Sequence, residues 1–373
     1  MGNVSGIKSC YGCGACAIAC GKHLISIKEN KAGFYTPFIE NTEACTDCGL
    51  CESVCSYTHD ELATKNVPII SFGAWSKDEN VRRRSSSGGV CFEFEKYLLD
   101  NGYKICVVRY NIQLRRAEHY IADNLNDLDQ GLGSKYIQSY TLDAFSSMKR
   151  DEKYLVIGSP CQMDSFRRYV KKFRLEDNFI LIDFFCHGVP SSILWKKYLN
   201  SVSNSIEELS GVAWRNKQFG WHDSYAISLS QESIKERQKE NISRFSTGNA
   251  FYEMFFCDSC FNKACYSKCK FKYDQSSADV RVGDFWGNTY KDDDKGVSAV
   301  VAFTEKGKSL IMNSDIERIE HPFEVVAEGQ MKSSLILTLK DKIIFNILKT
   351  DIPLKMVVAC KRVLNKIEKY MKK

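Results

Sequence analysis

Short apolar runs alternate with amphipathic segments through the middle of the chain. Runs rich in β-branched and aromatic residues are typical of buried strands, and apolar residues spaced three and four apart are typical of helices that bury one face. Strands are expected at residues 69–75, 103–110, 154–158 and 179–186, and helices near 89–101, 141–150 and 162–174. This strand–helix–strand order predicts an α/β core with at least some parallel pairing.

Weaker patterns flank this core. Two further strand-like runs cover residues 225–230 and 297–303, and the charged stretch 231–244 between them predicts a solvated loop or hairpin tip. The polar stretch 57–68, which ends at Pro68, predicts a linker between an N-terminal module and the core.

The last segment, residues 340–373, predicts a basic amphipathic helix. It carries ten Lys or Arg against three Asp or Glu, whereas the rest of the chain holds 42 basic and 43 acidic residues. The apolar face of this helix is expected to consist of Met356, Cys360, Val363, Ile367 and Tyr370. Such a helix either docks on its own body, which is the interpretation that we favour, or contacts an anionic membrane surface or a partner.

Composition narrows the class of protein. A chain of 373 residues exceeds a lone ferredoxin and leaves room for one or two further domains. Its 17 cysteines, an odd number with mostly metal-like spacing, predict a reducing, cytoplasmic setting. We find no signal-peptide pattern and no run of about 18 apolar residues. The net charge is +6, but the basic residues are not interleaved with aromatic residues as they are in nucleic-acid binders. No nucleic-acid partner is therefore expected.

Cysteine spacing is the strongest chemical signal. The run C-x2-C-x2-C-x3-C occurs twice in the first 55 residues, and it is typical of two [4Fe-4S] clusters, because three thiolates wrap one cubane while the fourth turns toward the other. One cluster is expected on Cys10, Cys13, Cys16 and Cys55, and the other on Cys20, Cys45, Cys48 and Cys51. Structural zinc is the weaker alternative, since it favours more open spacings. Residues 1–60 are thus predicted to form a small ferredoxin-type domain that carries single electrons.

A third cysteine group lies far downstream. It consists of Cys257, Cys260, Cys265 and Cys269, and the turn 283–287 follows it. Four thiols within thirteen residues predict another metal site, either a third iron–sulfur cluster or zinc. We favour the cluster, because two clusters upstream make an electron relay the more probable context. Three further cysteines, Cys91, Cys106 and Cys360, lie on apolar patterns and are expected in the core.

Candidate cofactor and proton-transfer residues follow predicted strands. Three arginines, Arg82 to Arg84, precede the loop Ser85-Ser86-Ser87-Gly88-Gly89, which opens a helix. Free backbone N–H groups at such a helix start would suit a phosphate, although an ordinary turn has the same composition. Cys161 follows one strand and is a cofactor contact, a cluster ligand or a buried small residue. His187 follows another strand and is a candidate catalytic group near neutral pH, with a structural role as the alternative.

Several segments together resemble the beta subunits of coenzyme F420 hydrogenases and dehydrogenases and their bacterial relatives. The matching pieces are Ser85–Gly89, Gly133–Ser139, Gly158–Gln162, Cys186–Ser191, Trp214–Trp221, Cys269–Gly287 and Lys295–Ser298. The resemblance implies an iron–sulfur flavoprotein with bound FAD, and it places Ser85 to Gly89 and Gly133, Ser134, Lys135 and Tyr136 around the flavin. It also implies that Cys186 is a ligand or near neighbour of the third cluster.

The fold expected from these signals is a 2[4Fe-4S] ferredoxin domain followed by a mixed α/β flavin-binding domain. The expected boundaries are 1–60 for the ferredoxin domain, 69–205 and 206–339 for the two halves of the flavin domain, and 340–373 for the basic helix. The expected activity is oxidoreduction that couples one-electron clusters to hydride chemistry at FAD, on a sugar or polysaccharide precursor, since similar bacterial proteins are associated with polysaccharide synthesis. The alternative is an electron-transfer subunit that feeds a catalytic partner. Expected partners are a ferredoxin or another redox protein and a small-molecule acceptor.

Overall fold

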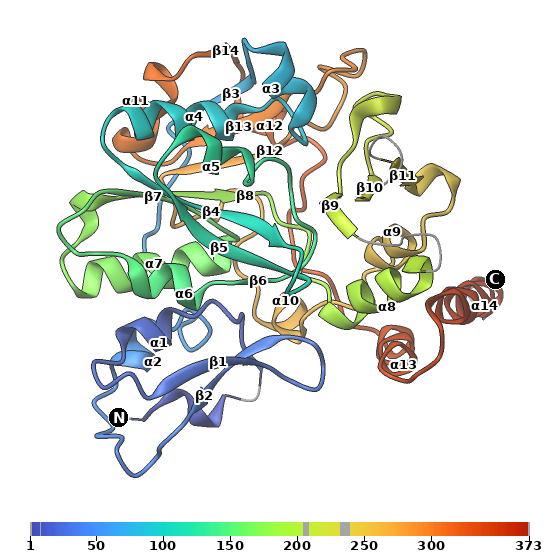
Figure 1. Cartoon of the computed structure of the whole chain (residues 1–373), viewed down its shortest axis with the longest axis horizontal. Helices are drawn as coiled ribbons and strands as arrows, with labels where there is room; N and C mark the ends of the chain where they lie inside the picture. The colour runs from blue at the N-terminus through green and yellow to red at the C-terminus, as the bar shows by residue number, and fades with distance from the viewer. Residues whose placement is uncertain (1, 8, 204–208, 232–238, 372–373) are drawn as a thin grey trace.

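A nine-stranded mixed sheet with helices on both faces forms the centre of the molecule (Figure 1). The computed structural model describes residues 2–7, 9–203, 209–231 and 239–371. The strand order is β14-β3-β13-β12-β8-β7-β4-β5-β6. The strands are β3 Ile70–Ser76, β4 Lys104–Asn111, β5 Arg116–Ala122, β6 Ser139–Tyr140, β7 Tyr154–Ile157, β8 Phe179–Phe184, β12 Val280–Asp284, β13 Ser298–Ala302 and β14 Ile316–Glu320.

Parallel pairing occupies the middle of this sheet. Strands β4, β7, β8 and β12 pair in parallel, in that order. On one side, β13, β3 and β14 continue the sheet with antiparallel pairs, and on the other side β5 pairs antiparallel with β4. The expectation of an α/β core with some parallel strands is confirmed. Because β7 and β8 run in parallel, the loops after both strands open at the same edge of the sheet.

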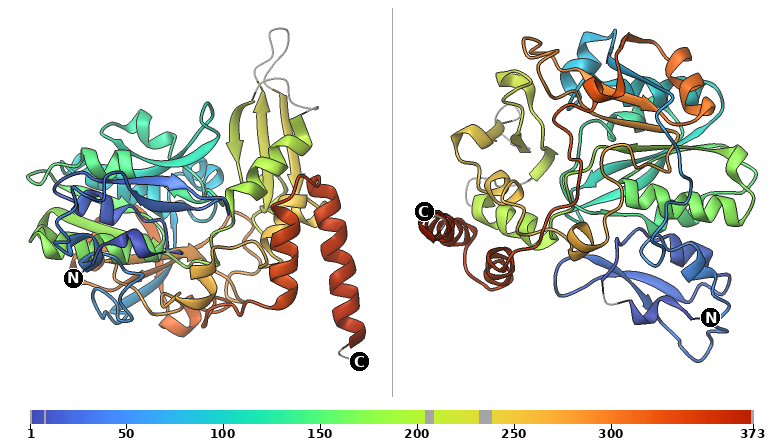
Figure 2. Two further views of the ribbon diagram at one scale, coloured as in Figure 1. Left: turned by 90° about the horizontal axis from the view of Figure 1, so that it is seen from below. Right: turned by 180° about the vertical axis from the view of Figure 1, so that it is seen from behind.

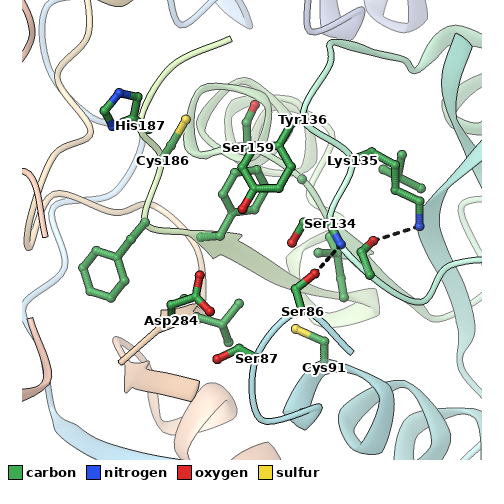
Figure 3. Close-up of a pocket in the computed structure, with 18 of the residues that line it drawn as sticks. Ser86, Ser87, Cys91, Ser134, Lys135, Tyr136, Ser159, Cys186, His187 and Asp284 are labelled. Carbon is green, nitrogen blue, oxygen red and sulfur yellow. Dashed lines mark hydrogen bonds between the residues drawn. The ribbon is translucent and has the colours of Figure 1, made fainter. Parts of the chain in front are cut away.

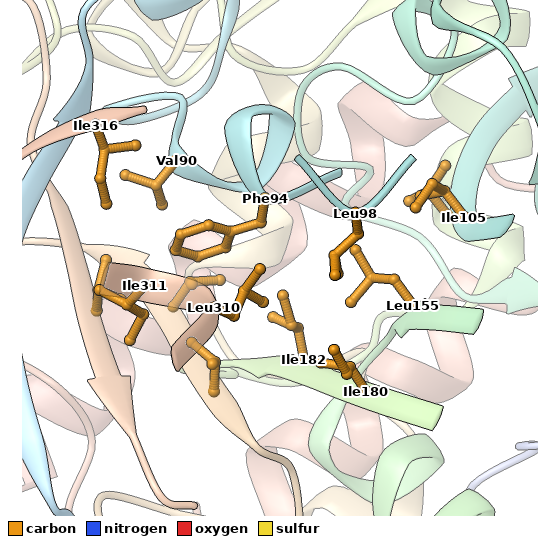
Figure 4. Packing of buried hydrophobic residues seen from close by; sticks show 14 of the residues in the cluster. Val90, Phe94, Leu98, Ile105, Leu155, Ile180, Ile182, Leu310, Ile311 and Ile316 are labelled. Carbon is orange, nitrogen blue, oxygen red and sulfur yellow. The ribbon is translucent and has the colours of Figure 1, made fainter. Parts of the chain in front are cut away.

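Helices cover the sheet because their apolar residues recur on one face. In α4, Val90, Phe94 and Leu98 follow one another at intervals of four and are all buried. Figure 4 shows them packed with Leu310 and Ile311 of α11 over the sheet. The opposite face is covered by α6 and α7 (Figure 1). The helices around the sheet are α3 Glu79–Arg84, α4 Val90–Asp100, α5 Leu125–Asp129, α6 Leu142–Ser147, α7 Pro160–Lys172, α11 Glu305–Asn313 and α12 Phe323–Val326, with the 3-10 turn η2 Glu176–Asn178.

The N-terminal module lies against α6 and α7 (Figure 1). Its elements are η1 Val4–Gly6, α1 Ala15–Ala19, the antiparallel hairpin of β1 Ile25–Glu29 and β2 Tyr35–Ile39, and α2 Leu50–Ser53. Gly14 and Gly49 cap α1 and α2 in equivalent places of the two cysteine runs, with φ of 78° and 74°. Only glycine adopts this conformation without a steric penalty, so the duplicated sequence folds twice into the same turn.

A second core lies beside the large sheet. It is built on a three-stranded antiparallel sheet and on helices from distant parts of the chain, with Trp195, Trp214 and Phe251 at its centre. The elements are α8 Ser192–Val202, β9 Leu209–Ala213, η4 Lys217–Phe219, β10 Ala226–Gln231, β11 Lys239–Arg244, η5 Phe245–Thr247, α9 Ala250–Phe255, α10 Lys263–Ser267, α13 Leu339–Leu348 and α14 Leu354–Met371.

Two expectations from the sequence change here. The first concerns the charged stretch 231–244, which is not all loop, because 239–244 form β11 and pair with β10; residues 232–238 lie outside the described part. The two halves expected at 69–205 and 206–339 share one sheet, because strands within 280–320 complete the sheet begun by 70–184. Residues 340–371 share the core of α8 and α9.

The second change concerns the amphipathic helix α14. The apolar face expected to dock, with Val363 and Ile367, is exposed, whereas Leu354, Val357 and Val358 on another face are buried against α8 and α9. The helix has apolar residues on two faces, and the second core provides a partner for one of them. Among the described helices, none combines the length and apolar character needed to cross a membrane.

Candidate redox site

The structure arranges the N-terminal cysteines in a first group around Cys16 and a second around Cys51. Burial raises the pKa of Cys16 well above its ordinary value, and the thiols Cys13, Cys55, Cys10 and Cys51 raise it further, in that order. Burial is also the largest cause that raises the pKa of Cys51, and the thiols Cys20 and Cys48 add to it. Cys55 thus lies with three cysteines of the first run, and Cys20 lies with Cys48 and Cys51 of the second.

Such buried, adjacent thiols fit a metal cluster chemically. Burial raises the pKa of Cys10 to about 12 and that of Cys13 to about 11, so the bare thiols would stay protonated at neutral pH. Cationic irons reverse this balance, because a coordinating thiol is deprotonated outright. The last cysteine of the second group, Cys45, accepts a hydrogen bond from Asn3 Nδ2 at 3.6 Å.

The third cysteine group differs from the expected one. Cys186, Cys265 and Cys269 all lie close enough to Cys161 for their charges to raise its pKa, after burial as the largest cause. Cys257 and Cys260 form a separate pair, in which both thiols donate to the carbonyl oxygen of Met254, at 3.1 and 3.4 Å. The candidate four-thiol group is therefore Cys161, Cys186, Cys265 and Cys269. Within the described residues, no three His, Cys, Asp or Glu side chains are placed to hold one single ion.

A signal for this regrouping exists in the sequence. Cys161 and Cys186 each follow the carboxyl end of a predicted strand, and these strands, β7 and β8, are parallel neighbours. Side chains after neighbouring parallel strands meet at one edge of the sheet. The short spacing within 257–269 pointed instead to Cys257 and Cys260 as the partners of Cys265 and Cys269.

Tyr11 lies between the N-terminal module and the third group. Burial raises its pKa strongly, and Cys161 and Cys269 are the next largest causes. Its ring contacts Tyr57 and Phe271 edge-on, with centroids 5.5 and 5.6 Å apart. Since Tyr11 directly follows Cys10, the two thiol groups approach each other across this one residue.

A cavity of about 410 Å³ opens beside the third group. Cys186 and His187 line one end, and Ser86, Ser134 and Lys135 line the other (Figure 3). Tyr11 also lines the cavity. The volume lies within the range of ligand-binding pockets. Aromatic side chains make up much of the wall, namely Tyr136, Tyr225, Phe255, Phe256 and Trp286.

Asp284 fixes the aromatic wall through a buried ion pair. Arg215 NH1 donates to Asp284 Oδ2 at 2.8 Å and to the Tyr136 hydroxyl at 3.1 Å. Trp221 Nε1 donates to Asp284 Oδ1 at 3.0 Å, and the Arg215 guanidinium stacks 4.3 Å from the Tyr225 ring centroid. Arg215 and Asp284 lie inside segments that carried the family resemblance, but the sequence alone did not indicate that they pair.

The serine–glycine loop contributes to the cavity in a different way from that expected. Ser86 Oγ accepts a hydrogen bond from the Ser134 amide at 2.8 Å and so joins the two loops expected around the flavin (Figure 3). Ser85, Ser86, Ser87 and Gly89 line the cavity, but Gly88 does not. A Cβ on Gly88 would stand 2.3 Å from the carbonyl oxygen of Ala74, so this glycine is required by the sheet.

The arginines before this loop are engaged elsewhere. Arg82 is buried and pairs with Asp293 at 2.8 Å, and Arg84 pairs with Asp129. Neither these two side chains nor Arg83 lines the cavity. The three arginines before the loop therefore do not offer their charge to a phosphate in the cavity.

Lys135 is a cation that lines the cavity and is held by backbone carbonyl oxygens of its own loop. Its Nζ donates to the carbonyl oxygens of Gly131, Leu132 and Gly133, at 2.7, 3.0 and 2.9 Å. Burial lowers the pKa of Lys135 to about 7, and nearby Glu95 opposes that shift. Burial also raises the pKa of Glu95, which lines the same cavity, to about 8.

His187 lies at the other end of the cavity with a carboxylate partner. Its Nε2 is 2.6 Å from Asp258 Oδ1, and both side chains are about one-third exposed. Lys272 holds the same segment, since its Nζ donates to the carbonyl oxygens of Cys186 and His187, at 2.5 and 3.0 Å. Cys91 also lines the cavity, whereas Cys106 is fully buried in the core and Cys360 is half-exposed on α14.

Known proteins match this chain along most of its length. Residues 71–146 match the family described as coenzyme F420 hydrogenase/dehydrogenase, beta subunit N-term, and residues 151–322 match the C terminus of the same beta subunit. Residues 9–58 match the 4Fe-4S dicluster domain, which confirms the iron–sulfur expectation for the N-terminal module. No curated protein matches the chain.

A chain from the F420-reducing [NiFe] hydrogenase complex of Methanosarcina barkeri is similar to this one among solved structures. The two sequences are 15% identical, and the alignment covers 84% of this chain and 96% of that chain with a TM-score of 0.46.

Proposed function

The chain belongs to the coenzyme F420 hydrogenase/dehydrogenase beta subunit family, and from that premise we propose that it is an iron–sulfur flavoprotein oxidoreductase. Family and dicluster matches establish a redox protein with a 4Fe-4S module. The proposal adds a third cluster, an FAD in the cavity and a small-molecule acceptor. The observation that carries it is the placement of a four-thiol group between the ferredoxin module and the cavity.

We assign the three clusters by the grouping of the thiols. The first is held by Cys10, Cys13, Cys16 and Cys55, the second by Cys20, Cys45, Cys48 and Cys51, and the third by Cys161, Cys186, Cys265 and Cys269. The crossing of the fourth ligand between the two N-terminal runs is what their spacing predicts. Cys186, which lines the cavity, brings the third cluster next to the bound cofactor.

The path for electrons follows from this arrangement. The first cluster and the third cluster lie on either side of Tyr11, which itself lines the cavity. The second cluster is the more exposed entry, since Cys48 is exposed and Cys45 is partly exposed, while Cys10, Cys13 and Cys16 are buried. A ferredoxin or another redox protein would therefore donate at the second cluster.

The lining of the cavity suits an FAD in its chemistry. Its aromatic wall, with Tyr136, Tyr225 and Trp286, suits a flat ring system. The loops of Ser86 and Ser134 offer hydroxyl and backbone groups at the opposite end. When bound, FAD supplies the conversion between single electrons and hydride transfer.

Residues of this chain position the reacting groups and move protons. His187 Nε2 is held by Asp258, and Nδ1 makes no hydrogen bond to the described residues, so Nδ1 is the nitrogen available to a substrate in the cavity. Lys272 fixes the backbone that carries Cys186 and His187. We propose His187 as the proton-transfer residue.

A sugar or polysaccharide precursor is the proposed acceptor, supported by the resemblance to bacterial proteins associated with polysaccharide synthesis. The second candidate is an electron-transfer subunit, which the description of the family as a beta subunit favours. An acceptor-reduction assay on the purified chain distinguishes the enzyme from the electron-transfer subunit. An enzyme reduces a small acceptor with reduced ferredoxin alone, whereas a subunit does so only with its partner chain.

Anaerobic reconstitution tests the cofactor content. We expect about twelve irons, on the stoichiometry of three cubanes, and one FAD per chain. Cys161→Ser should remove about four of these irons. Cys260→Ser, a matched change of another buried thiol, should leave the iron count unaltered.

Other iron counts would decide against parts of the proposal. About eight irons in the unaltered chain would show that the third cluster is absent. A loss of iron in the Cys260 variant would show that Cys257, Cys260, Cys265 and Cys269 are the ligands, as the sequence spacing predicts. Zinc lost from the Cys161 variant at constant iron would make the third site a structural metal centre. An iron-replete chain without FAD would exclude the flavoprotein function.

A further inference from the structure

Helix α14 has two apolar faces, and the molecule buries only one. Leu354, Val357 and Val358 belong to the buried core beside α8 and α9, and Leu364 continues the same face as a half-buried residue. At 100° per residue, the opposite side of the helix carries a different set of apolar residues.

That opposite side is an exposed apolar stripe. It consists of Met356, Val363, Ile367 and Tyr370, whose exposed fractions are 51, 56, 48 and 78%. Their spacings of seven, four and three residues place them along one line of the helix. The helix lies at an edge of the molecule, on the side away from the N-terminus (Figure 2).

Unpaired lysines flank the stripe. Lys355, Lys366 and Lys369 are exposed and form no ion pair with any residue that the structure describes. The other charges of the helix are engaged: Arg362 pairs with Glu253, and Glu368 pairs with Lys340 at 2.6 Å. Since Glu368 is the single acidic residue of α14 and pairs with Lys340, no acidic residue of the helix neutralises these three lysines.

We propose that this face of α14 binds an anionic lipid surface. A helix with this distribution lies in the plane of the membrane, with its apolar stripe among the lipid chains and its lysines at the negatively charged headgroups. A second copy of the chain fits less well, because two such faces would bring unpaired lysines together.

Sedimentation with lipid vesicles tests the proposal on the full-length protein with its clusters loaded. We expect binding to vesicles of phosphatidylglycerol and phosphatidylcholine that is at least tenfold stronger than binding to phosphatidylcholine alone. Added salt should weaken the first interaction, because screening shortens the reach of the lysine charges. Each of Lys355→Gln, Lys366→Gln and Lys369→Gln should weaken binding to the anionic vesicles about fivefold.

The apolar stripe has its own variant and a matched control. Val363→Asp combined with Ile367→Asp should reduce anionic-vesicle binding at least tenfold. Val67→Asp combined with Ile319→Asp changes the same residue types to the same charge at comparably exposed places, 70 and 47%, and should bind as the unaltered protein does. Cluster content in all variants confirms that they are folded.

Four results would overturn the proposal. The first is that the unaltered protein fails to sediment with anionic vesicles, and the second is that it binds neutral vesicles equally well. The third is that the stripe variant and its control lose binding to the same extent. The fourth is a dimer in sedimentation velocity that the stripe variant converts to a monomer, in which case the face joins two copies of this chain.

Discussion

His119 is an imidazole whose burial favours its neutral form, although its hydrogen bond to the Ile157 carbonyl oxygen opposes that shift. Its side chain lies against Phe145, with ring centroids 5.4 Å apart, and its Nε2 is 3.0 Å from the carbonyl oxygen of Ile157. Burial lowers the pKa of His119 from 6.5 to about 4. The unfolded chain therefore binds a proton between pH 6.5 and pH 4 that the folded chain rejects, and folding loses stability as the pH falls through this range.

Replacing this imidazole should remove that dependence. In His119→Phe, the ring contact remains, and we expect a pH-independent cost from the lost hydrogen bond. The free energy of unfolding of the unaltered protein should fall relative to the variant by about 1.4 kcal/mol per pH unit between pH 6.5 and pH 4. Denaturant unfolding of both proteins at pH 7 and pH 5 measures the difference. Equal pH dependence in the two proteins would show that His119 is not the responsible group.

At the scale of elements, the loop before α4 couples the sheet to the cavity. Gly88 donates its amide to Ser298 Oγ at 2.9 Å and lies against the backbone of β3, while Gly89 begins α4 with φ of 86°. Ser86 from the same loop holds Ser134 across the cavity. A change in the packing of this loop therefore moves both the start of α4 and the cavity wall.

Gly88→Ala should destabilise the protein rather than act on the cofactor alone. The added Cβ would stand 2.3 Å from Ala74 O and 2.9 Å from the Ser298 amide, both backbone atoms that cannot rotate away. We expect a loss of about 1–3 kcal/mol, the usual cost of overpacking. Gly6→Ala is the matched control, since no atom lies within 4 Å of its added Cβ. Thermal unfolding measures both, and an unchanged melting temperature for Gly88→Ala would contradict the packing argument.

At the scale of the whole molecule, Asp164 of α7 joins three distant segments. This fully buried carboxylate accepts hydrogen bonds from Ser56 Oγ, the Ala63 amide and Ser277 Oγ, at 2.5, 2.7 and 2.6 Å. The first partner belongs to the ferredoxin module, the second to the segment 57–68, and the third to the segment before β12. The segment expected to be a linker is thereby fixed to the body.

Asp164→Ala should loosen the ferredoxin module from the body. Three buried donors lose their charged acceptor, and we expect a cost of about 3 kcal/mol or more. Limited proteolysis should then cut within residues 57–68 faster than in the unaltered protein. Asp143→Ala, which changes a 74% exposed carboxylate on α6, should leave the cleavage rate unaltered. Resistance of the Asp164 variant to cleavage would show that other contacts hold the module.

The sequence by itself determined the local chemistry and the local elements. Cysteine spacing predicted the 4Fe-4S module because ligands of one cubane come from adjacent turns of the chain. Periodicity predicted α4, α7 and the central strands because their burial repeats at the period of the element. At α14 the same periodicity predicted the wrong buried face. The helix has two apolar faces, and the face that packs against α8 and α9 is the other one.

Only the tertiary structure decided which distant residues meet. The parallel pairing of β7 with β8 brings Cys161 to Cys186, and the packing of α9 removes Cys260 from their group. The tertiary structure also pairs Arg215 with Asp284 at 2.8 Å beside the cavity, although 68 residues lie between them in the sequence. Spacing along the chain constrains neighbours within a few residues, whereas contacts between segments are fixed by which apolar faces the whole core can bury together.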